Sequence, residues 1–313
     1  MLNNKHFQSM LKIIKEMAYS RDIWEIFYDF LEMGAIAVSN CVDLNQYEAR
    51  EKQYMTVIHK YTSEHQKLFP ELLAQLVLAL DCEFQRGNFA DVLGSLFHEL
   101  ELHNKFKGQF FTPQHICDFM GKILLNENDK AILEQGYISV AEPACGSGAM
   151  VLGFANAVKE CGYNHSHQMF VFATDIDLKC VYMCYLQLAL YGIPAMVVHG
   201  NSLTLEEWSH WYTPAYIING WGWKLRHPRT AVQSEKVIED AQAIDDVQVV
   251  DEPLAVDEAQ KPEAIQAVGA MPTIEQAQTV EEIQPNVRFP THKEAVTTFE
   301  QLDLFALLNE ESP

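Results

Sequence analysis

The stretch that decides the fold is Ile138-Ser-Val-Ala-Glu-Pro-Ala-Cys-Gly-Ser-Gly-Ala-Met150. It opens with an apolar run of strand length, passes through an acid into small residues, and leads into 150–158, where apolar residues have helical spacing. A Gly-rich turn lets the backbone approach a ligand closely, and free N–H groups at the helix start face that ligand. The acid stands before the glycines, at the strand end. This placement suits a ligand with a ribose and an amino acid better than a pyrophosphate.

A second strand of aromatic and branched residues is predicted at 169–174, directly before Asp175-Ile-Asp177. An acid at the end of the second strand of a doubly wound sheet is placed to accept hydrogen bonds from ribose hydroxyls, and Asp175 is our choice for that role. A simple cap of the next helix, 178–191, is an equally weighted alternative for Asp175 and Asp177. A third strand is predicted at 194–199.

Two motifs together resemble a known family. Glu142-Pro-Ala-Cys-Gly-Ser-Gly148 resembles motif I of DNA adenine-N6 methyltransferases, in the branch that includes the M subunits of type I restriction systems. Lys107-Gly-Gln-Phe-Phe-Thr-Pro113, about thirty residues upstream, resembles the segment that closes over S-adenosylmethionine in that branch. The stretch from Asp91 to Leu100 resembles the helix leading into it. The resemblance implies an α/β, Rossmann-like S-adenosylmethionine-dependent methyltransferase fold, with DNA as the substrate.

The resemblance also implies the cofactor contacts. They are Gln109, Phe110, Phe111, Thr112, Pro113, Glu142, Pro143, Ala144, Cys145, Gly146, Ser147, Gly148, Asp175, Ile176 and Asn201. The two phenylalanines would stack on adenine or line the methionine pocket, and plain core packing is the alternative. Asn201 follows the third strand, where the family places an acid or amide beside the adenine, and a turn Asn is the alternative. Thr112 and Pro113 suit the start of a helix at 114–125.

The family's fourth motif, Asn/Asp/Ser-Pro-Pro-aromatic, is not matched, because this chain has no Pro-Pro pair. In the family this motif grips the exocyclic amine of a flipped adenine, and its aromatic ring stacks on the base. Our preferred substitute is Asn219 with Trp221, after an apolar strand beginning at Tyr216. The alternative is Thr213, Pro214 and Tyr216. A third possibility is that the tryptophans of this region are packing residues.

Periodicity, composition and the resemblances together divide the chain into four parts: a helical N-terminal domain (1–105), a methyltransferase-like domain (106–229), a disordered acidic linker (230–295) and a C-terminal partner-binding peptide (296–313). Residues 230–313 contain 18 acidic and 4 basic residues, which is −14 of the net charge of −21. Globular composition ends near residue 229, so we expect a sheet shorter than the family's. Neither residues 1–229 nor residues 230–313 carry the excess of Lys and Arg that is typical of a protein that binds DNA on its own. This favours help from a partner such as a specificity subunit.

The last informative stretch is Gln301-Leu302-Asp303-Leu304-Phe305, which resembles the pentapeptide by which bacterial replication and repair proteins bind the sliding clamp. Gln301 can hydrogen-bond at a pocket rim while Leu304 and Phe305 fill an apolar cleft. The alternative is a short amphipathic helix that docks back onto the chain through Phe299, Leu302 and Phe305.

Several classes are disfavoured. No apolar run reaches eighteen residues, and the first twenty residues do not form a secretory signal. Seven cysteines without a CxxC pair argue against a disulfide framework or a metal site and suit a reducing cytoplasm. We therefore expect a cytoplasmic S-adenosylmethionine-dependent methyltransferase that acts on adenine N6 in DNA and is tethered to the clamp. The alternative is an inactive homologue that binds the cofactor and acts as an anti-restriction or replication-linked regulator.

Overall fold

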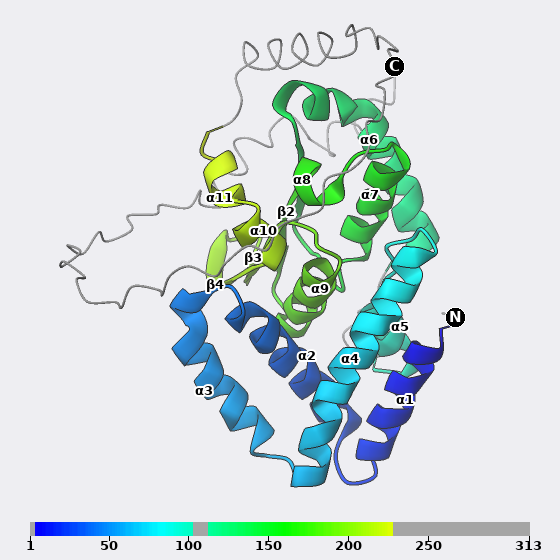
Figure 1. The fold of residues 1–313 in the computed structure, drawn as a ribbon, viewed down its shortest axis with the longest axis vertical. Helices are drawn as coiled ribbons and strands as arrows, with labels where there is room; N and C mark the ends of the chain where they lie inside the picture. The colour runs from blue at the N-terminus through cyan, green and yellow to red at the C-terminus, as the bar shows by residue number, and fades with distance from the viewer. Residues whose placement is uncertain (1–3, 103–111, 228–313) are drawn as a thin grey trace, which may run out of the picture.

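A computed structural model describes residues 4–102 and 112–227, apart from the side chains of 126–129. The N-terminal part is helical, as predicted (Figure 1). Its elements are α1 (Lys5–Met17), α2 (Ile23–Asn40), the 3₁₀ helix η1 (Leu44–Gln46), α3 (Tyr47–Ile58), α4 (Ser63–Gln85) and α5 (Val92–Glu99). Side chains of Asn4, Asp22, Thr62 and Asp91 cap four of these helices by accepting hydrogen bonds from first-turn N–H groups.

The second part alternates helices with strands. Its helices are α6 (Gln114–Gln135), α7 (Ala149–Glu160), α8 (His165–Gln168), α9 (Leu178–Leu190), α10 (Pro214–Ile218) and α11 (Trp221–Lys224). Its strands are β1 (Ile138–Glu142), β2 (Met169–Asp175), β3 (Ala195–Asn201) and β4 (Glu206–Tyr212). The described sheet has the order β1-β2-β3-β4. The first three strands are parallel and β4 is antiparallel to β3. Parallel strands joined by helices confirm the α/β class.

The two faces of the sheet are buried against different partners, because successive strand residues point to opposite sides. Val171 and Ala173 join a large core that includes α7, α9 and the N-terminal helices. Phe170 and Phe172 join a smaller cluster with Tyr216 and Trp221, from α10 and α11. Burial on both faces explains why β2 and β3 read as apolar runs rather than as alternating patterns, whereas β1 is only partly buried.

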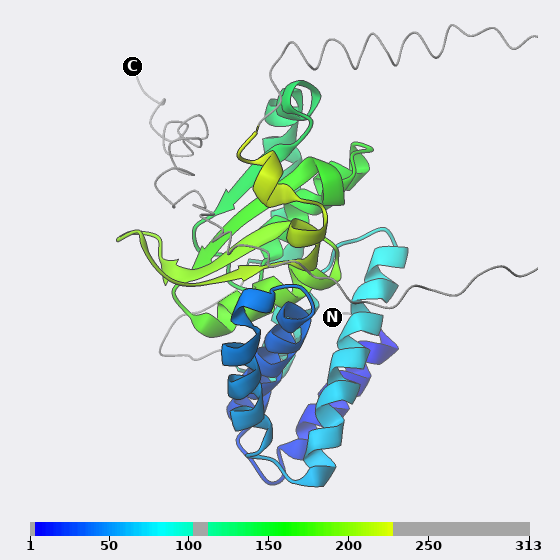
Figure 2. The same ribbon diagram turned by 60° about the vertical axis from the view of Figure 1, so that its left-hand side comes forward.

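The N-terminal helices and the α/β part share one continuous core. Helix α2 packs along α9, and Figures 1 and 2 show α1 to α4 gathered at one end of the sheet. Helices α6 and α7 cross closely at Gly121 and Gly153. A Cβ at Gly121 would lie 2.5 Å from the carbonyl oxygen of Gly153. The helical part therefore supports the α/β part directly through this shared core.

Three expectations about local structure are corrected. The strand expected from Tyr216 is wrong: residues 214–218 form α10, because Thr213 caps a helix start that has proline at its first position. The helix predicted at 114–125 continues to Gln135, and its N-cap is Pro113 rather than Thr112. The strand β4 was not expected. Among the described residues, no helix is both long and apolar enough to cross a membrane.

Candidate functional site

Glu142, Asp175 and Asn201 end three neighbouring parallel strands and therefore meet at one edge of the sheet. The register places Glu142 beside Ala173 and Asp175 beside His199, so β2 ends two residues beyond β1, and β3 ends two residues beyond β2. The carboxyl edge of a doubly wound sheet is where such folds bind their ligands. The sequence predicted correctly that Glu142, Asp175 and Asn201 lie at or just after the ends of strands.

The loop between β1 and α7 is held over this edge by backbone hydrogen bonds. The N–H of Cys145 donates to the carbonyl oxygen of Thr174 at 2.9 Å, and the N–H of Gly148 donates to the carbonyl oxygen of Cys145 at 2.7 Å. The N–H of Gly146 donates to Oδ2 of Asp175 at 2.8 Å. The predicted Gly-rich turn and the predicted acid therefore contact each other directly.

Two glycines of the loop have left-handed backbone conformations. Gly146 has a φ of 54° and Gly148 a φ of 95°. Glycine is favoured here because a side chain clashes with its own backbone at such angles. A Cβ at Gly148 would also lie 3.2 Å from Sγ of Cys184 on α9. Gly148 occupies the N-cap position of α7 without a side-chain cap, which leaves first-turn N–H groups for a ligand.

Two carboxylates dominate the electrostatics of the site. Burial raises the pKa of Glu142, and the neighbouring Asp175 adds to this, while the N–H of Ala144 opposes it by donating to Oε1 at 3.1 Å. Burial also raises the pKa of Asp175, against hydrogen bonds from the N–H groups of Asp177 and Gly146. Partly desolvated carboxylates with unused lone pairs are good acceptors for hydroxyl groups of a ligand.

These residues fit a nucleoside ligand. Asp175 can accept from hydroxyls, and Ile176 beside it is 62% exposed, an apolar surface that suits the face of a base. Ser147 points away from the ligand side and is only 1% exposed. The Oδ1 of Asn201 accepts from the N–H groups of Leu203 and Thr204, which is the turn role considered as the alternative.

The upstream motif is only partly described. Thr112 and Pro113 are exposed at the start of α6. Gln109, Phe110 and Phe111 lie outside the described residues, so their roles stay predictions.

The structure does not bring the expected fourth motif to this edge. Asn219 donates from Nδ2 to the carbonyl oxygen of Ser166 at 3.0 Å, and the indole N–H of Trp221 donates to the same oxygen at 3.4 Å. Ser166 belongs to α8, which directly precedes β2, so this contact lies at the amino end of the sheet. Trp221 is fully buried and stacks with Phe170. The expectation that Asn219 and Trp221 follow a strand end beside the Gly-rich loop is therefore wrong.

The alternative fourth motif fails for the same reason. The hydroxyl of Thr213 donates to the carbonyl oxygen of Ile193 and accepts from the N–H of Ala195, both at the start of β3. Tyr216 is buried against Phe170 and Tyr212. Because β4 runs antiparallel, it carries the chain away from the carboxyl edge before residues 213–227 begin. The interpretation of these tryptophans as packing residues is confirmed for Trp211 and Trp221, whereas Trp208 and Trp223 are exposed.

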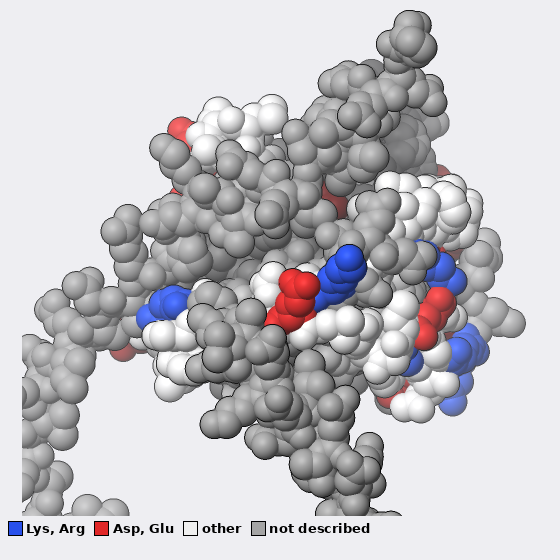
Figure 3. Space-filling view, turned by 90° about the horizontal axis from the view of Figure 1, so that it is seen from above, with Lys and Arg blue, Asp and Glu red and all other residues white. Residues whose placement is uncertain are grey.

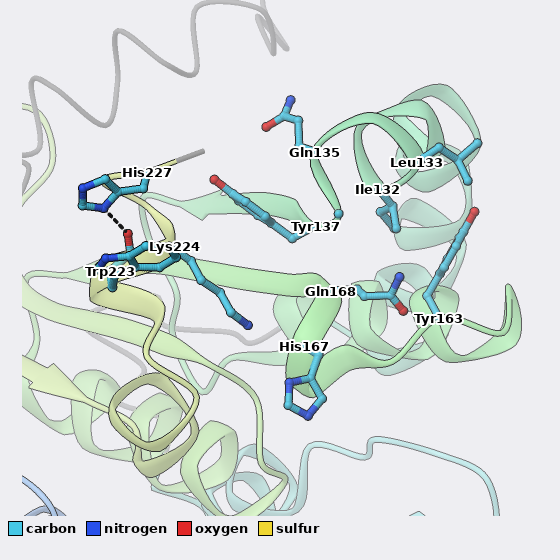
Figure 4. A pocket seen from close by; sticks show the side chains of 11 residues that line it. Ile132, Leu133, Gln135, Tyr137, Tyr163, His167, Gln168, Trp223, Lys224 and His227 are labelled. Atoms are coloured by element: carbon cyan, nitrogen blue, oxygen red, sulfur yellow. Dashed lines mark hydrogen bonds between the residues drawn. The ribbon is translucent and has the colours of Figure 1, made fainter. Parts of the chain in front are cut away.

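A pocket at this opposite end encloses about 660 Å³ (Figure 4). Residues just before β1 and β2 line it, together with the end of the described chain: Gly136, Tyr137, His167, Gln168, Trp223, Lys224 and His227. In Figure 4 the ring of His227 turns back to the carbonyl oxygen of Trp223, at 3.1 Å. We call the carboxyl ends of β1, β2 and β3, together with the loop 143–148, the loop edge. The pocket shares no residue with it.

Sequence reasoning missed two residues that hold the loop. Asp91 accepts a hydrogen bond from the hydroxyl of Ser147 at 2.6 Å, and Nε2 of Gln187 donates to the carbonyl oxygen of Ser147 at 2.8 Å. Asp91 lies in the helix that resembles the family, which was a usable signal. Gln187 lies in a mostly apolar helix. A polar residue in the buried part of such a helix indicates that its side chain makes hydrogen bonds inside the protein.

Three comparisons relate the chain to known proteins, and the family model among them identifies its family. A family model described as N-6 DNA methylase matches residues 85–251, more than half of the chain. The methylase subunit of the type I restriction enzyme MpnII from Mycoplasma pneumoniae is 22% identical over 240 residues, which is 71% of this chain and 41% of that protein. This chain thus spans 41% of the length of that relative. A putative class I S-adenosylmethionine-dependent methyltransferase from Listeria monocytogenes superposes with a TM-score of 0.36 at 16% identity, over 64% of this chain and 54% of that one.

Proposed function

The chain belongs to the N-6 DNA methylase family, and from this premise we propose that it transfers a methyl group to N6 of adenine in DNA. Its cofactor is S-adenosylmethionine. When bound, the cofactor supplies an electrophilic methyl group on a sulfonium centre. The observation that carries the proposal is the hydrogen bond between Gly146 and Asp175, which joins the Gly-rich loop to the acid at the second strand end.

Each residue of the edge has a proposed task. Asp175 accepts hydrogen bonds from the ribose hydroxyls and, through Gly146, holds the loop closed. The N–H groups at the start of α7 and the carboxylate of Glu142 face the amino-acid end of the ligand. Ile176 covers one face of the adenine. Since methyl transfer mainly requires alignment of two reacting atoms, a rigid edge of this kind contributes by orienting the methyl donor.

The grip on the target adenine is proposed to come from outside residues 4–102 and 112–227. Among the described residues neither Asn219 nor Tyr216 reaches the loop edge. On the face seen in Figure 3, the visible Lys and Arg side chains stand in separate groups, several of them beside Asp and Glu, and do not form one basic patch. Residues 1–229 have a net charge of −7, which opposes binding to the phosphate backbone. We propose that a partner, such as a specificity subunit, supplies DNA contacts.

The peptide Gln301–Phe305 lies outside the described residues, and we propose that it tethers the chain to the sliding clamp. Replacing Leu304 and Phe305 together by alanine should abolish co-elution with purified clamp, because these side chains fill the apolar cleft. Replacing Leu307 and Leu308 instead is the matched control. Co-elution that survives the first pair of substitutions would remove the clamp proposal.

Long-read sequencing of host DNA tests the activity, with and without expression of the full chain, and with and without a candidate specificity subunit. We expect new N6-methyladenine at a defined sequence. The Gly146→Val variant should abolish it, because a branched side chain at a φ of 54° displaces the loop. Asn219→Ala should preserve it, because Asn219 lies at the opposite end of the sheet. Loss of methylation in a folded Asn219→Ala variant would contradict this placement.

A second candidate is a homologue that binds the cofactor but does not methylate, and acts as an anti-restriction or replication-linked regulator. The absence of a fourth motif from the described part of the loop edge favours it. Two measurements distinguish the candidates. If the chain binds S-adenosylmethionine in calorimetry but no subunit combination gives new methylation, the result supports the regulator.

A further inference from the structure

The Gly-rich loop is held by a buried polar network that connects it to α5, the last of the N-terminal helices. Asp91, Ser147 and Gln187 are 7%, 1% and 0% exposed. They come from the start of α5, from the loop, and from α9. Such burial requires that their polar atoms find partners within the protein.

The carboxylate of Asp91 accepts three hydrogen bonds. Its Oδ1 accepts from the N–H of Gly94 at 2.8 Å and from Nε2 of Gln187 at 2.9 Å. Its Oδ2 accepts from the hydroxyl of Ser147 at 2.6 Å. All three donors are uncharged. Removing any one donor would leave a buried carboxylate oxygen with one hydrogen bond fewer, which lowers the stability of the folded state. The position of the carboxylate is therefore strongly constrained.

Gln187 closes the network. Its Nε2 bridges Oδ1 of Asp91 and the carbonyl oxygen of Ser147, at 2.9 and 2.8 Å, while its Oε1 accepts from the N–H of Leu93 at 3.1 Å. Ser147 is therefore held at both its side chain and its main chain. The flanking residues, Gly146 and Gly148, are the two with left-handed backbones, so the anchor fixes the residue between them.

The packing around the network leaves room for the contact between Asp91 and Ser147. A Cβ at Gly94 would lie 2.0 Å from Oδ2 of Asp91 and 2.7 Å from Oγ of Ser147. Glycine at this position leaves the space in which the carboxylate meets the serine. Helix α5 thus touches the loop through a polar contact rather than through apolar packing alone.

We propose that Asp91 and Gln187 are positioning residues for the cofactor: they set the loop conformation in which the N–H of Gly146 meets Asp175, without touching the cofactor themselves. This inference rests on the proposed binding of S-adenosylmethionine at the loop edge. It makes cofactor affinity depend on a residue of the N-terminal helical part.

The test compares the full-length chain with Asp91→Ala, Asp91→Asn and Ser147→Ala, by calorimetry with S-adenosylmethionine and by thermal unfolding. Asp91→Ala should weaken binding about tenfold to a hundredfold, the range expected for losing hydrogen bonds to a charged group. Asp91→Asn should restore most of the affinity, because its oxygen can accept from Gly94 and Gln187 while its amide donates to the serine hydroxyl. Hydrogen exchange should show lost protection at residues 145–148 in Asp91→Ala even without cofactor.

The matched control is Asp29→Ala. Asp29 is also buried, at 2% exposed, and accepts from the hydroxyl of Tyr61 at 2.7 Å, within the helical part. It should lower the melting temperature comparably but leave cofactor affinity and loop exchange unchanged. Equal affinity in wild type and Asp91→Ala, or equal losses in Asp91→Ala and Asp29→Ala, would overturn the proposal. If Asp91→Ala does not fold, the cofactor affinity and loop exchange of Ser147→Ala are compared with those of the wild type and Asp29→Ala in the same way. Failure of the wild type to bind refutes the proposed function instead.

Discussion

Replacing Gly148 by alanine tests whether the loop conformation binds the cofactor. Two costs add at this position. The φ of 95° strains any residue with a Cβ, by about 1–2 kcal/mol. The new Cβ would lie 3.2 Å from Sγ of Cys184, so the loop or α9 must shift by a few tenths of an ångström, which we take as about 1 kcal/mol more.

Gly87 supplies a close control. Its φ is 96°, almost the same as that of Gly148, but a Cβ there would meet nothing within 4 Å, and it lies just after α4. Gly87→Ala therefore shares the backbone strain without the contact. We expect about 2–3 kcal/mol of destabilisation for Gly148→Ala and about 1–2 kcal/mol for Gly87→Ala.

Calorimetry with S-adenosylmethionine and denaturant unfolding measure the two effects. Gly148→Ala should weaken cofactor binding at least about tenfold, because displaced N–H groups lose their alignment with the ligand. Gly87→Ala should bind as the wild type does. Adding Cys184→Ala to Gly148→Ala should recover part of both losses, because it removes the contacting sulfur. Wild-type affinity in Gly148→Ala, or no recovery on removing Cys184, would refute the reasoning.

The remaining predictions concern single side chains. Asp175→Asn should weaken S-adenosylmethionine binding about tenfold or more in calorimetry, because one of two backbone N–H donors loses its acceptor; Asp177→Asn, which keeps a helix cap, should change it little. Burial raises the pKa of Glu142 above its value in the unfolded chain, so its contribution to stability is full below the unfolded pKa and is lost as pH rises through the folded pKa. Glu142→Gln should therefore raise the melting temperature at neutral pH and flatten its acidic pH dependence; an unchanged profile would contradict this. Trp221→Ala should cost about 3–5 kcal/mol in denaturant unfolding yet leave cofactor affinity per folded molecule unchanged, and a selective loss of affinity would contradict its packing role.

The edge of the sheet that carries the Gly-rich loop was largely predictable because its signals are local. An apolar run, an acid and a cluster of glycines within 138–150 specify strand, turn and helix from neighbouring residues alone. Asp175 followed from the same rule applied to the next strand. Parallel strands align their carboxyl ends, so identifying two such strands was enough to bring Glu142 and Asp175 together.

The fourth motif was not predictable in this way. Residues 213–221 combine one proline, several aromatics and Asn219, a pattern compatible with a strand end or with a capped short helix. Packing decided between them: Tyr216 and Trp221 bury against Phe170 on the second face of the sheet, which requires α10 and α11 there. Local propensity is weak over so few residues, so the cap at Thr213 needs this burial in order to select the helix.

The sequence by itself determined the α/β class, the Gly-rich turn and the acids at the strand ends, because each depends on spacing within one or two adjacent elements. Only the tertiary structure decided that residues 213–227 lie at the end of the sheet opposite the loop, and that Asp91 and Gln187 hold Ser147. These contacts join residues 40 to 96 positions apart. No local pattern encodes such contacts, since they arise when α5, the Gly-rich loop and α9 pack together around buried polar groups.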